Sequence, residues 1–185
     1  MTSVLGNEHA AFSAISRAKV SKLSDEPKQE AVAVSYDRSF LNELPKAKGG
    51  EAWACLSEAL YFEARGEPIK GIFAVAEVIL NRVKAERFPD TVCGVVKQGT
   101  GRKYQCQFTY TCDGHKEVIN EPAAFEKVAK IARLMLDGTV PANLTDGATH
   151  YHTKAVAPRW SRVYARTATI GQHHFYRQSE RYASN

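Results

Sequence analysis

Two apolar helices separated by only a few residues are the feature that most constrains this fold. Residues 51–65 predict a first helix that stops at Gly66, and Pro68 is placed to open a second helix that runs to about Glu86. Apolar side chains cover nearly half of the circumference of the second helix, so we expect it to be the central, best-buried helix. The first helix therefore ends where that central helix begins.

Glu63 lies on the apolar stripe of the first helix. It follows Trp53 by ten residues and Leu60 by three, spacings that keep it on the side that should face the core. A carboxyl group there is costly to ionise, so its pKa should rise and it can hold a proton near neutral pH. That is the state a general acid needs. In the alternative interpretation, Glu63 is a buried structural acid paired with Arg65 or Arg82.

Three other acids on the two helices compete with Glu63. Glu58 lies about 140° away around the first helix and should be solvated. Glu67 precedes Pro68 and is expected to favour the N-terminus of the second helix. Glu77 lies at the margin of the apolar stripe, where charged residues normally meet solvent.

Length and charge limit the classes of protein to be considered. The chain has 185 residues, which suits one domain, and its net charge of +5 favours an anionic partner or serves solubility alone. No apolar run is long enough to span a membrane, and no signal peptide follows Met1. We therefore expect a cytosolic protein, or a mature or trimmed form of an exported one.

The cysteines favour the exported alternative. An even number in a small domain is compatible with two disulfides, and Cys106 and Cys112 could close a small loop. Buried free thiols are the alternative, whereas the spacings do not resemble a zinc site. The disulfide candidates are Cys55, Cys93, Cys106 and Cys112.

The pattern along the chain predicts an α+β domain, with helices first and a small antiparallel sheet last. Residues 1–50 are expected to be a largely disordered leader with a short helix near 7–18 and a docked stretch near 36–44. The catalytic domain would cover 51–178 and a tail 179–185. Within that domain we expect a third helix over 91–97 capped by Asp90, a functional loop over 98–121, a fourth helix over 122–136, and strands near 149–153, 162–169 and 173–177.

Histidines on the expected strands suggest a second kind of chemistry. His150 and His152 share one face of a strand while Tyr151 takes the other, a spacing that could place two imidazoles on a metal. With no third ligand in the pattern, a hydrogen-bonded or surface role is the stronger interpretation. His173 and His174 point to opposite faces and cannot form a site together.

Five motifs in order resemble the SleB/CwlJ-type cell-wall hydrolases, over roughly residues 53–177. They are Glu-Ala-Arg-Gly-Glu-Pro with Gly-Ile-Phe-Ala-Val-Ala-Glu-Val-Ile-Leu-Asn-Arg-Val; Phe-Pro-Asp-Thr-Val-Cys-Gly-Val-Val-Lys-Gln; Cys-Gln-Phe-Thr with Cys-Asp-Gly; Gly-Ala-Thr-His-Tyr-His; and Ile-Gly-Gln-His-His-Phe-Tyr. The resemblance implies a lysozyme-like or lytic-transglycosylase-like α+β domain that acts on peptidoglycan glycan strands. The paired cysteines are similar to those of exported Gram-negative members, which implies a periplasmic or cell-wall location.

The resemblance also assigns site residues. The catalytic glutamate of the family's Glu-Ala-Arg motif falls on Glu63, and the sugar groove would be lined by the Gln-Phe-Thr and Thr-x-Tyr positions. No cofactor and no metal are implied. The expected substrate-binding residues are Arg65, Gln98, Gln107, Phe108, Thr109, Thr149, Tyr151 and His152.

The reaction expected from this set is cleavage between N-acetylmuramic acid and N-acetylglucosamine, with Glu63 as acid and then base. Asp113 and Asp146 both stand in Asp-Gly turn pairs, so no convincing second acid is present and non-hydrolytic release of 1,6-anhydromuramoyl ends is favoured. The alternatives are a hydrolytic muramidase or glucosaminidase, a metal-dependent amidase using His150 and His152, and a non-catalytic peptidoglycan-binding module. Nucleic-acid binding ranks last.

Overall fold

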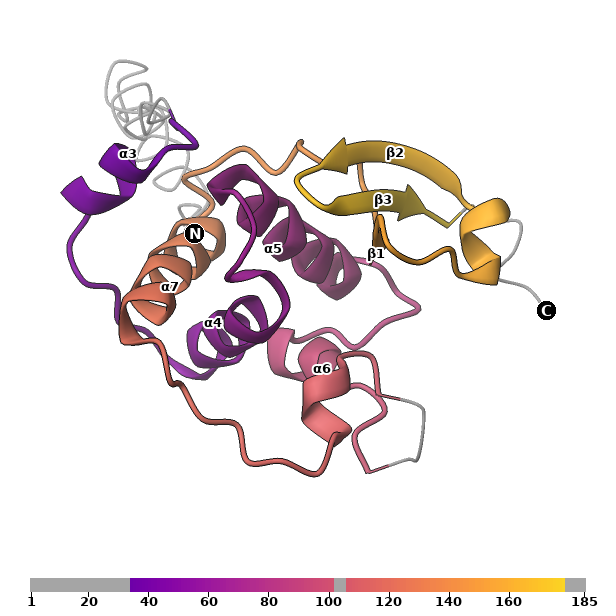
Figure 1. Cartoon of the computed structure of the whole chain (residues 1–185), viewed down its shortest axis with the longest axis horizontal. Helices are drawn as coiled ribbons and strands as arrows, with labels where there is room; N and C mark the ends of the chain where they lie inside the picture. The colour runs from indigo at the N-terminus through magenta and orange to yellow at the C-terminus, as the bar shows by residue number, and fades with distance from the viewer. Residues whose placement is uncertain (1–33, 102–105, 179–185) are drawn as a thin grey trace, which may run out of the picture. The chain divides into compact units, whose positions relative to one another are not determined.

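The computed structural model describes residues 34–101 and 106–178. The short helix expected near 7–18 and the tail over 179–185 lie outside these residues. Helices come first and a small antiparallel sheet comes last, so the α+β prediction is confirmed (Figure 1). No helix within the described ranges is long and apolar enough to cross a membrane.

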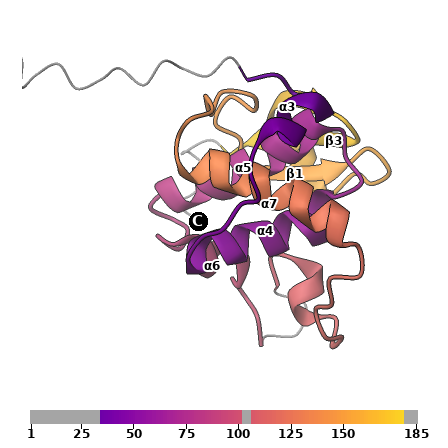
Figure 2. The same cartoon turned by 90° about the vertical axis from the view of Figure 1, so that its left-hand side faces the viewer.

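Three long helices form the helical part of the fold. They are α4 (Glu51–Ala64), α5 (Ile69–Lys84) and α7 (Pro122–Leu136), and they lie side by side in both views (Figures 1 and 2). Phe73 and Ile79 of α5 are fully buried, which confirms α5 as the central helix. The packed face of α5 therefore fixes where the ends of α4 and α7 lie.

The short helix α6 (Val92–Val96) follows α5. Its N-cap is Thr91, whose hydroxyl accepts a hydrogen bond from the Gly94 amide at 3.1 Å. The predicted cap at Asp90 is therefore wrong by one residue, because the hydroxyl of Thr91 already satisfies the free amide of the first turn.

The stretch before α4 docks on α7. It contains α3 (Arg38–Glu43), and the carboxylate of Asp37 caps α3 by accepting a hydrogen bond from the Phe40 amide at 2.9 Å. Leu41 is only 3% exposed, and its carbonyl accepts a hydrogen bond from Lys130 Nζ at 3.0 Å. The docked stretch expected near 36–44 is thus present.

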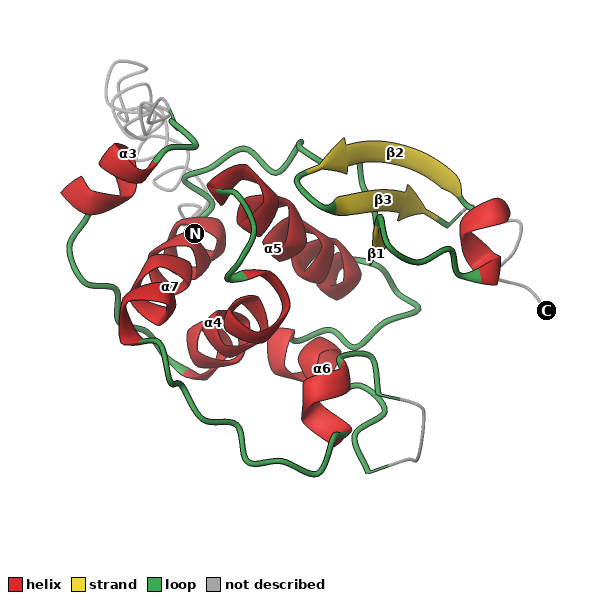
Figure 3. Ribbon diagram, viewed as in Figure 1, coloured by secondary structure: helices red, strands yellow, loops and turns green. Residues whose placement is uncertain are grey.

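The sheet has the strand order β1-β3-β2, with both pairs antiparallel (Figure 3). The strands are β1 (His150–Thr153), β2 (Ala165–Ile170) and β3 (His173–Arg177). The 3-10 helix η2 (Arg159–Arg162) delays the start of β2 relative to the expected strand over 162–169. Tyr151 pairs with Phe175, and His152 pairs with His174 on the other face, as the alternation predicts.

Polar side chains on one side of α5 hold the backbone that leads into β1. Glu77, Asn81 and Arg82, here called the α5 polar row, all bond to residues 144–149 across a long gap in sequence. The carboxylate of Glu77 accepts hydrogen bonds from the Leu144 amide, the Thr145 amide and the Thr145 hydroxyl, at 2.8, 3.0 and 2.5 Å. Glu77 is 1% exposed, so the expectation that it meets solvent at the margin of the stripe is wrong.

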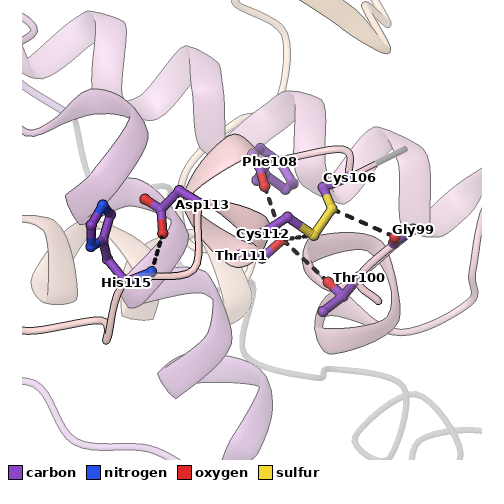
Figure 4. Close-up of a disulfide and its surroundings, with 8 residues drawn as sticks. All are labelled: Gly99, Thr100, Cys106, Phe108, Thr111, Cys112, Asp113 and His115. Carbon is purple, nitrogen blue, oxygen red and sulfur yellow. Dashed lines mark hydrogen bonds between the residues drawn. A yellow bond between two sulfur atoms is a disulfide. The ribbon is translucent and has the colours of Figure 1, made fainter. Parts of the chain in front are cut away.

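Two disulfides confirm the predicted cysteine use. Cys55–Cys93 joins α4 to α6, with the two Cα atoms 5.3 Å apart. Cys106–Cys112 closes a six-residue separation around the 3-10 helix η1 (Thr109–Cys112), where the Thr111 hydroxyl also bonds to the Phe108 carbonyl at 2.9 Å (Figure 4). The second bridge therefore fixes the loop that carries Tyr110.

The Glu77 contacts lead to a prediction on stability. Glu77→Gln replaces one acceptor oxygen with an NH2 group that faces buried donors, so we expect a loss of about 1–3 kcal/mol in the free energy of unfolding. Urea unfolding of the whole chain measures this loss. Glu86→Gln is the matched control at an exposed position and should change stability by less than about 0.5 kcal/mol. Equal effects of the two changes would contradict the role given to Glu77.

Candidate active site

Glu63 meets the sheet at the end of α4. It is the second-last residue of that helix, and its Oε2 accepts a hydrogen bond from the Tyr151 hydroxyl of β1 at 3.0 Å. The α5 polar row holds the chain just before β1, so α5 sets the position of Tyr151 relative to α4. Two elements far apart in sequence thus meet at one carboxyl group.

The surroundings of Glu63 favour its protonated form. Burial raises the pKa of Glu63, while the hydrogen bond from Tyr151 and the charge of Arg82 act in the opposite direction and do not cancel the effect. Burial and the neighbouring Glu63 also raise the pKa of Tyr151 well above its usual value, so its hydroxyl stays a donor. The site therefore combines a carboxyl group whose neutral form is favoured by burial with a fixed hydrogen-bond donor.

Arg82 is a buried cation behind this pair. It is 2% exposed, its Nε donates to the Thr149 carbonyl at 2.6 Å, and its guanidinium carbon lies 5.3 Å from the Phe88 ring centroid. Burial lowers its pKa to about 10, so it remains charged at neutral pH. Its Nη1 has no hydrogen-bond partner in the described part of the chain. A charge held in this way can stabilise a carboxylate that forms at Glu63.

Tyr110 of η1 is a second tyrosine near Glu63. The charges of Glu58 and Glu63 both add to the effect of burial in raising the pKa of Tyr110, which places its phenol near both carboxyl groups. Its hydroxyl lies 3.5 Å from Glu58 Oε1, and its ring stacks on Phe62 at 4.5 Å between centroids. Tyrosines of β1 and of η1 thus both lie near Glu63.

Glu58 is less solvated than its position on the helix suggested. It is half-buried, and burial raises its pKa, with a further contribution from Glu117. The prediction of a solvated Glu58 is therefore wrong, because the loop that carries Tyr110 covers this side of α4. The pattern of apolar residues in α4 could not predict this cover, because Tyr110 lies 52 residues after Glu58 in the sequence.

Glu67 connects the sheet to the turn between α4 and α5. Its Oε2 accepts a hydrogen bond from the Gln172 amide at 2.9 Å, and its Oε1 lies 3.2 Å from His173 Nδ1. A Cβ on Gly171 would come within 1.9 Å of the Glu67 carboxylate, and Gly171 has a φ of +57°, so this turn requires glycine. The contact of Glu67 is with the β2–β3 hairpin, which the prediction of a helix-terminus role had missed.

His173 in turn supports Tyr151. Their rings meet edge to face at 5.1 Å between centroids. Burial lowers the pKa of His173, against the opposing charge of Glu67. A row of contacts therefore runs from Glu67 through His173 and Tyr151 to Glu63, and it combines residues from α4, β1, β3 and the turn after α4.

The expected substrate-binding residues of the loop differ in exposure. Gln107 and Thr109 are exposed. Gln98 is half-buried, and its Oε1 is among the buried polar atoms of the described residues that lack a hydrogen-bond partner. Phe108 is only 2% exposed, and its ring centroid lies 6.0 Å from the guanidinium carbon of Arg82. A side chain buried in this way packs against the site and is not available to contact a sugar.

The remaining expected residues lie in β1, just before it and at the end of α4. Thr149 is 4% exposed and reaches the site through its carbonyl, which holds Arg82. His152 lies on the opposite face from Tyr151, and its Nε2 is 3.0 Å from the Tyr176 hydroxyl. Arg65 donates from Nε to Glu121 at 2.8 Å, so it does not serve as the structural partner proposed for Glu63.

Metal ligation was an alternative for His150 and His152. Among the residues that the structure describes, no group of three or more His, Cys, Asp or Glu side chains is arranged to hold a metal ion. His150 Nδ1 lies 3.0 Å from the Thr149 hydroxyl, and its ring packs at 5.3 Å from Trp160 between centroids. Both histidines therefore have hydrogen-bonded places in an aromatic cluster on the outer face of the sheet.

Known proteins are similar to this chain in sequence. The model of the cell wall hydrolase family matches residues 66–176, a range that begins three residues after Glu63. A spore cortex-lytic enzyme of Halalkalibacterium halodurans is 35% identical over 123 residues, which are 65% of this chain and 33% of that protein. A spore cortex-lytic enzyme of Bacillus cereus is 34% identical over 121 residues, or 65% and 42% of the two chains. The chain thus matches less than half the length of either relative.

Solved structures show the same fold. The catalytic domain of the germination-specific lytic transglycosylase SleB from Bacillus anthracis matches 72% of this chain and 100% of its own, with a TM-score of 0.54 and 30% identity. The catalytic domain of the Bacillus cereus SleB protein matches 72% and 98%, with a TM-score of 0.52 and 30% identity. Since the family model covers more than half of the residues, this chain belongs to the cell wall hydrolase family.

Proposed function

We propose that this chain cleaves the β-1,4 bond between N-acetylmuramic acid and N-acetylglucosamine in peptidoglycan, with Glu63 as the catalytic acid. The observation that carries the proposal is the half-buried carboxyl group of Glu63, whose pKa burial raises and whose position the Tyr151 hydroxyl fixes. Membership of the cell wall hydrolase family and the likeness to a lytic transglycosylase domain support the substrate class.

In the proposed reaction, protonated Glu63 donates its proton to the glycosidic oxygen as the bond to the muramic acid carbon breaks. The sugar then carries oxocarbenium-like positive charge, and Glu63 is left as a carboxylate. Arg82 and the Tyr151 hydroxyl favour this charged form. The C6 hydroxyl of the same sugar closes a 1,6-anhydro ring and returns its proton to Glu63, so no water is consumed.

Hydrolysis is the second candidate, and one observation favours it. Glu58 is a half-buried carboxyl group close to Tyr110. The charge of Glu63 also raises the pKa of Tyr110, so both carboxyl groups lie near this phenol. An inverting hydrolase needs a second carboxylate to activate water. Burial raises the pKa of Glu58, which makes it a weaker acid and a stronger base once ionised. The chemical ends of the products separate the two reactions.

The proposed substrate implies a place of action outside the cytoplasm. Peptidoglycan lies there, and disulfides such as Cys55–Cys93 and Cys106–Cys112 form and persist in oxidising compartments. We therefore propose that the chain acts in the periplasm or the cell wall of a bacterium.

The main test is Glu63→Gln on purified sacculi. An amide cannot donate the proton, so we expect release of soluble fragments to fall by about 10²–10⁴-fold. Mass spectrometry of the products of the unchanged protein should show 1,6-anhydro ends. Reducing ends would indicate hydrolysis, and free stem peptides would indicate an amidase. Glu86→Gln is the exposed control; undiminished lysis by Glu63→Gln would remove the basis of the proposal.

Tyr151→Phe tests how the Glu63 pKa is set. The change removes a hydrogen bond that favours ionised Glu63, so the pKa of Glu63 should rise further. Activity that requires the protonated acid is lost as the pH rises through that pKa. We therefore expect the alkaline limb of the pH–rate profile to move to higher pH in Tyr151→Phe. Tyr164→Phe, on the outer face of the sheet, should leave the limb in place, and a shift to lower pH would contradict the assignment.

A further prediction concerns the pH dependence of stability. Because burial raises the folded-state pKa of Glu63, its ionisation costs more in the folded chain than in the unfolded one. The stabilisation that protonated Glu63 contributes is present in full below the pKa that Glu63 has in the unfolded chain. It is lost as the pH rises through the higher pKa that Glu63 has in the folded chain. Glu63→Gln should therefore melt at a higher temperature than the unchanged protein at pH 8, with the advantage lost near pH 4. A melting temperature equal to that of the unchanged protein at both pH values would rule this out.

A further inference from the structure

We propose that a pocket beside Glu63 binds the stem peptide attached to the muramic acid, and that it takes an amino-acid residue carrying both a carboxylate and an ammonium group. This inference rests on the proposed cleavage of peptidoglycan. The pocket, here called the side pocket, encloses about 250 Å³ and is lined by residues that include Phe62, Tyr110, Asp113, Lys116, Glu117 and Val118.

The side pocket shares a wall with the candidate active site. Phe62 is the residue before Glu63, and its ring stacks on Tyr110 with an interplanar angle of 18°. Tyr110 in turn lies close enough to Glu63 for the charge of Glu63 to raise the Tyr110 pKa. A group bound in the side pocket would therefore lie next to the sugar whose bond is cleaved.

The size of the side pocket favours a short peptide segment over a sugar chain. Sites for whole small molecules usually enclose about 300–1,000 Å³. A volume of about 250 Å³ is below that range and suits one or two amino-acid residues. In peptidoglycan, the stem peptide is attached to the muramic acid and is thus next to the proposed cleavage point.

The charges of the side pocket suit a ligand with both signs. Lys116 supplies a cation, Asp113 and Glu117 supply carboxylates, and Val118 adds an apolar side chain that is 47% exposed. Within the described ranges, neither Lys116 nor Glu117 makes an ion pair or a side-chain hydrogen bond of its own. Their charges are therefore available to a ligand. Stem peptides carry free carboxylates and an amino group, which match this set.

The wall of the side pocket is held at both ends of its loop. Cys106–Cys112 fixes the first end, next to Asp113, whose carboxylate accepts a hydrogen bond from the His115 amide at 2.8 Å (Figure 4). At the other end, the Tyr61 hydroxyl accepts hydrogen bonds from the Asn120 and Glu121 amides, each at 3.1 Å. A loop fixed in this way can present charges in a constant geometry, which lowers the entropic cost of binding.

The test compares two substrates and two matched variants. One substrate is glycan strands with their stem peptides, and the other is the same strands after an amidase has removed the peptides. Lys116→Glu reverses a charge inside the side pocket, and Lys84→Glu reverses an exposed charge on α5 as the control. We expect the unchanged protein to prefer the peptide-bearing strands and Lys116→Glu to lose about tenfold of that preference, the equivalent of one charge-assisted contact. Rates on bare strands should be equal for both variants.

The outcomes separate the inference from the proposed function. If the unchanged protein cleaves both substrates equally well, or if Lys116→Glu lowers both rates alike, the side pocket does not bind stem peptides although the proposed function stands. If neither substrate is cleaved, the proposed function fails and this inference with it.

A binding measurement gives a readout that does not depend on catalysis. A synthetic tripeptide of L-Ala, γ-D-Glu and meso-diaminopimelate, added to the whole chain carrying Glu63→Gln, should shift the NMR signals of the Val118 and Asn120 amides. The same shifts should be lost in the double variant Glu63→Gln with Lys116→Glu. Shifts confined to the other side of the molecule, or no shifts at millimolar peptide, would overturn the inference.

Discussion

The contacts of the α5 polar row with the backbone of residues 144–149 are the constraint on which the rest of this structure depends. Apolar packing among α4, α5 and α7 can form a core without them, but it does not specify where β1 begins. Glu77 fixes Leu144 and Thr145, Asn81 bonds to the Ala148 carbonyl, and Arg82 bonds to the Thr149 carbonyl. Two residues further along, Tyr151 then reaches Glu63. A row of polar side chains on the central helix therefore positions the strand that meets Glu63.

Three ionisable groups of this region, Glu77, Arg82 and Glu63, illustrate different solutions to the cost of burial. Glu77 satisfies its carboxylate with hydrogen bonds from backbone amides and a hydroxyl. Arg82 keeps its charge with one strong hydrogen bond and neighbouring aromatic rings. Among the residues that the structure describes, Glu63 receives a single hydrogen bond, from Tyr151, and burial outweighs it, so the neutral form is favoured. The least satisfied of the three is thus the one suited to proton transfer, which is where a stability cost is expected at a functional site.

The sequence predicted well whatever depends on local pattern. Apolar periodicity, with Pro68 and Gly66 as boundaries, placed α4 and α5 to within a few residues, and α7 matched its expected range of 122–136. The stripe of α4 also predicted that Glu63 faces inward, and the structure has it half-buried and hydrogen-bonded to Tyr151. The sequence could not predict that Glu77 is buried or that Glu58 is covered, because their partners lie 67 and 52 residues away along the chain. A helical pattern says which side of a helix faces inward, but a charged residue at its margin is assigned only when the covering loop is known.

Tyr110 connects the proposed reaction with the proposed recognition of the stem peptide. Its ring forms one wall of the side pocket through its stacking on Phe62, and its hydroxyl approaches Glu58, while its pKa responds to Glu63. The Cys106–Cys112 bridge lies within the same short loop, so the position of Tyr110 depends on a covalent restraint. A peptide residue seated against this ring would press on the wall that also limits the space beside Glu63. Whether a water molecule or the C6 hydroxyl of the sugar reaches the reacting carbon then depends on how that space is filled, and a bound stem peptide would favour the intramolecular hydroxyl by excluding water.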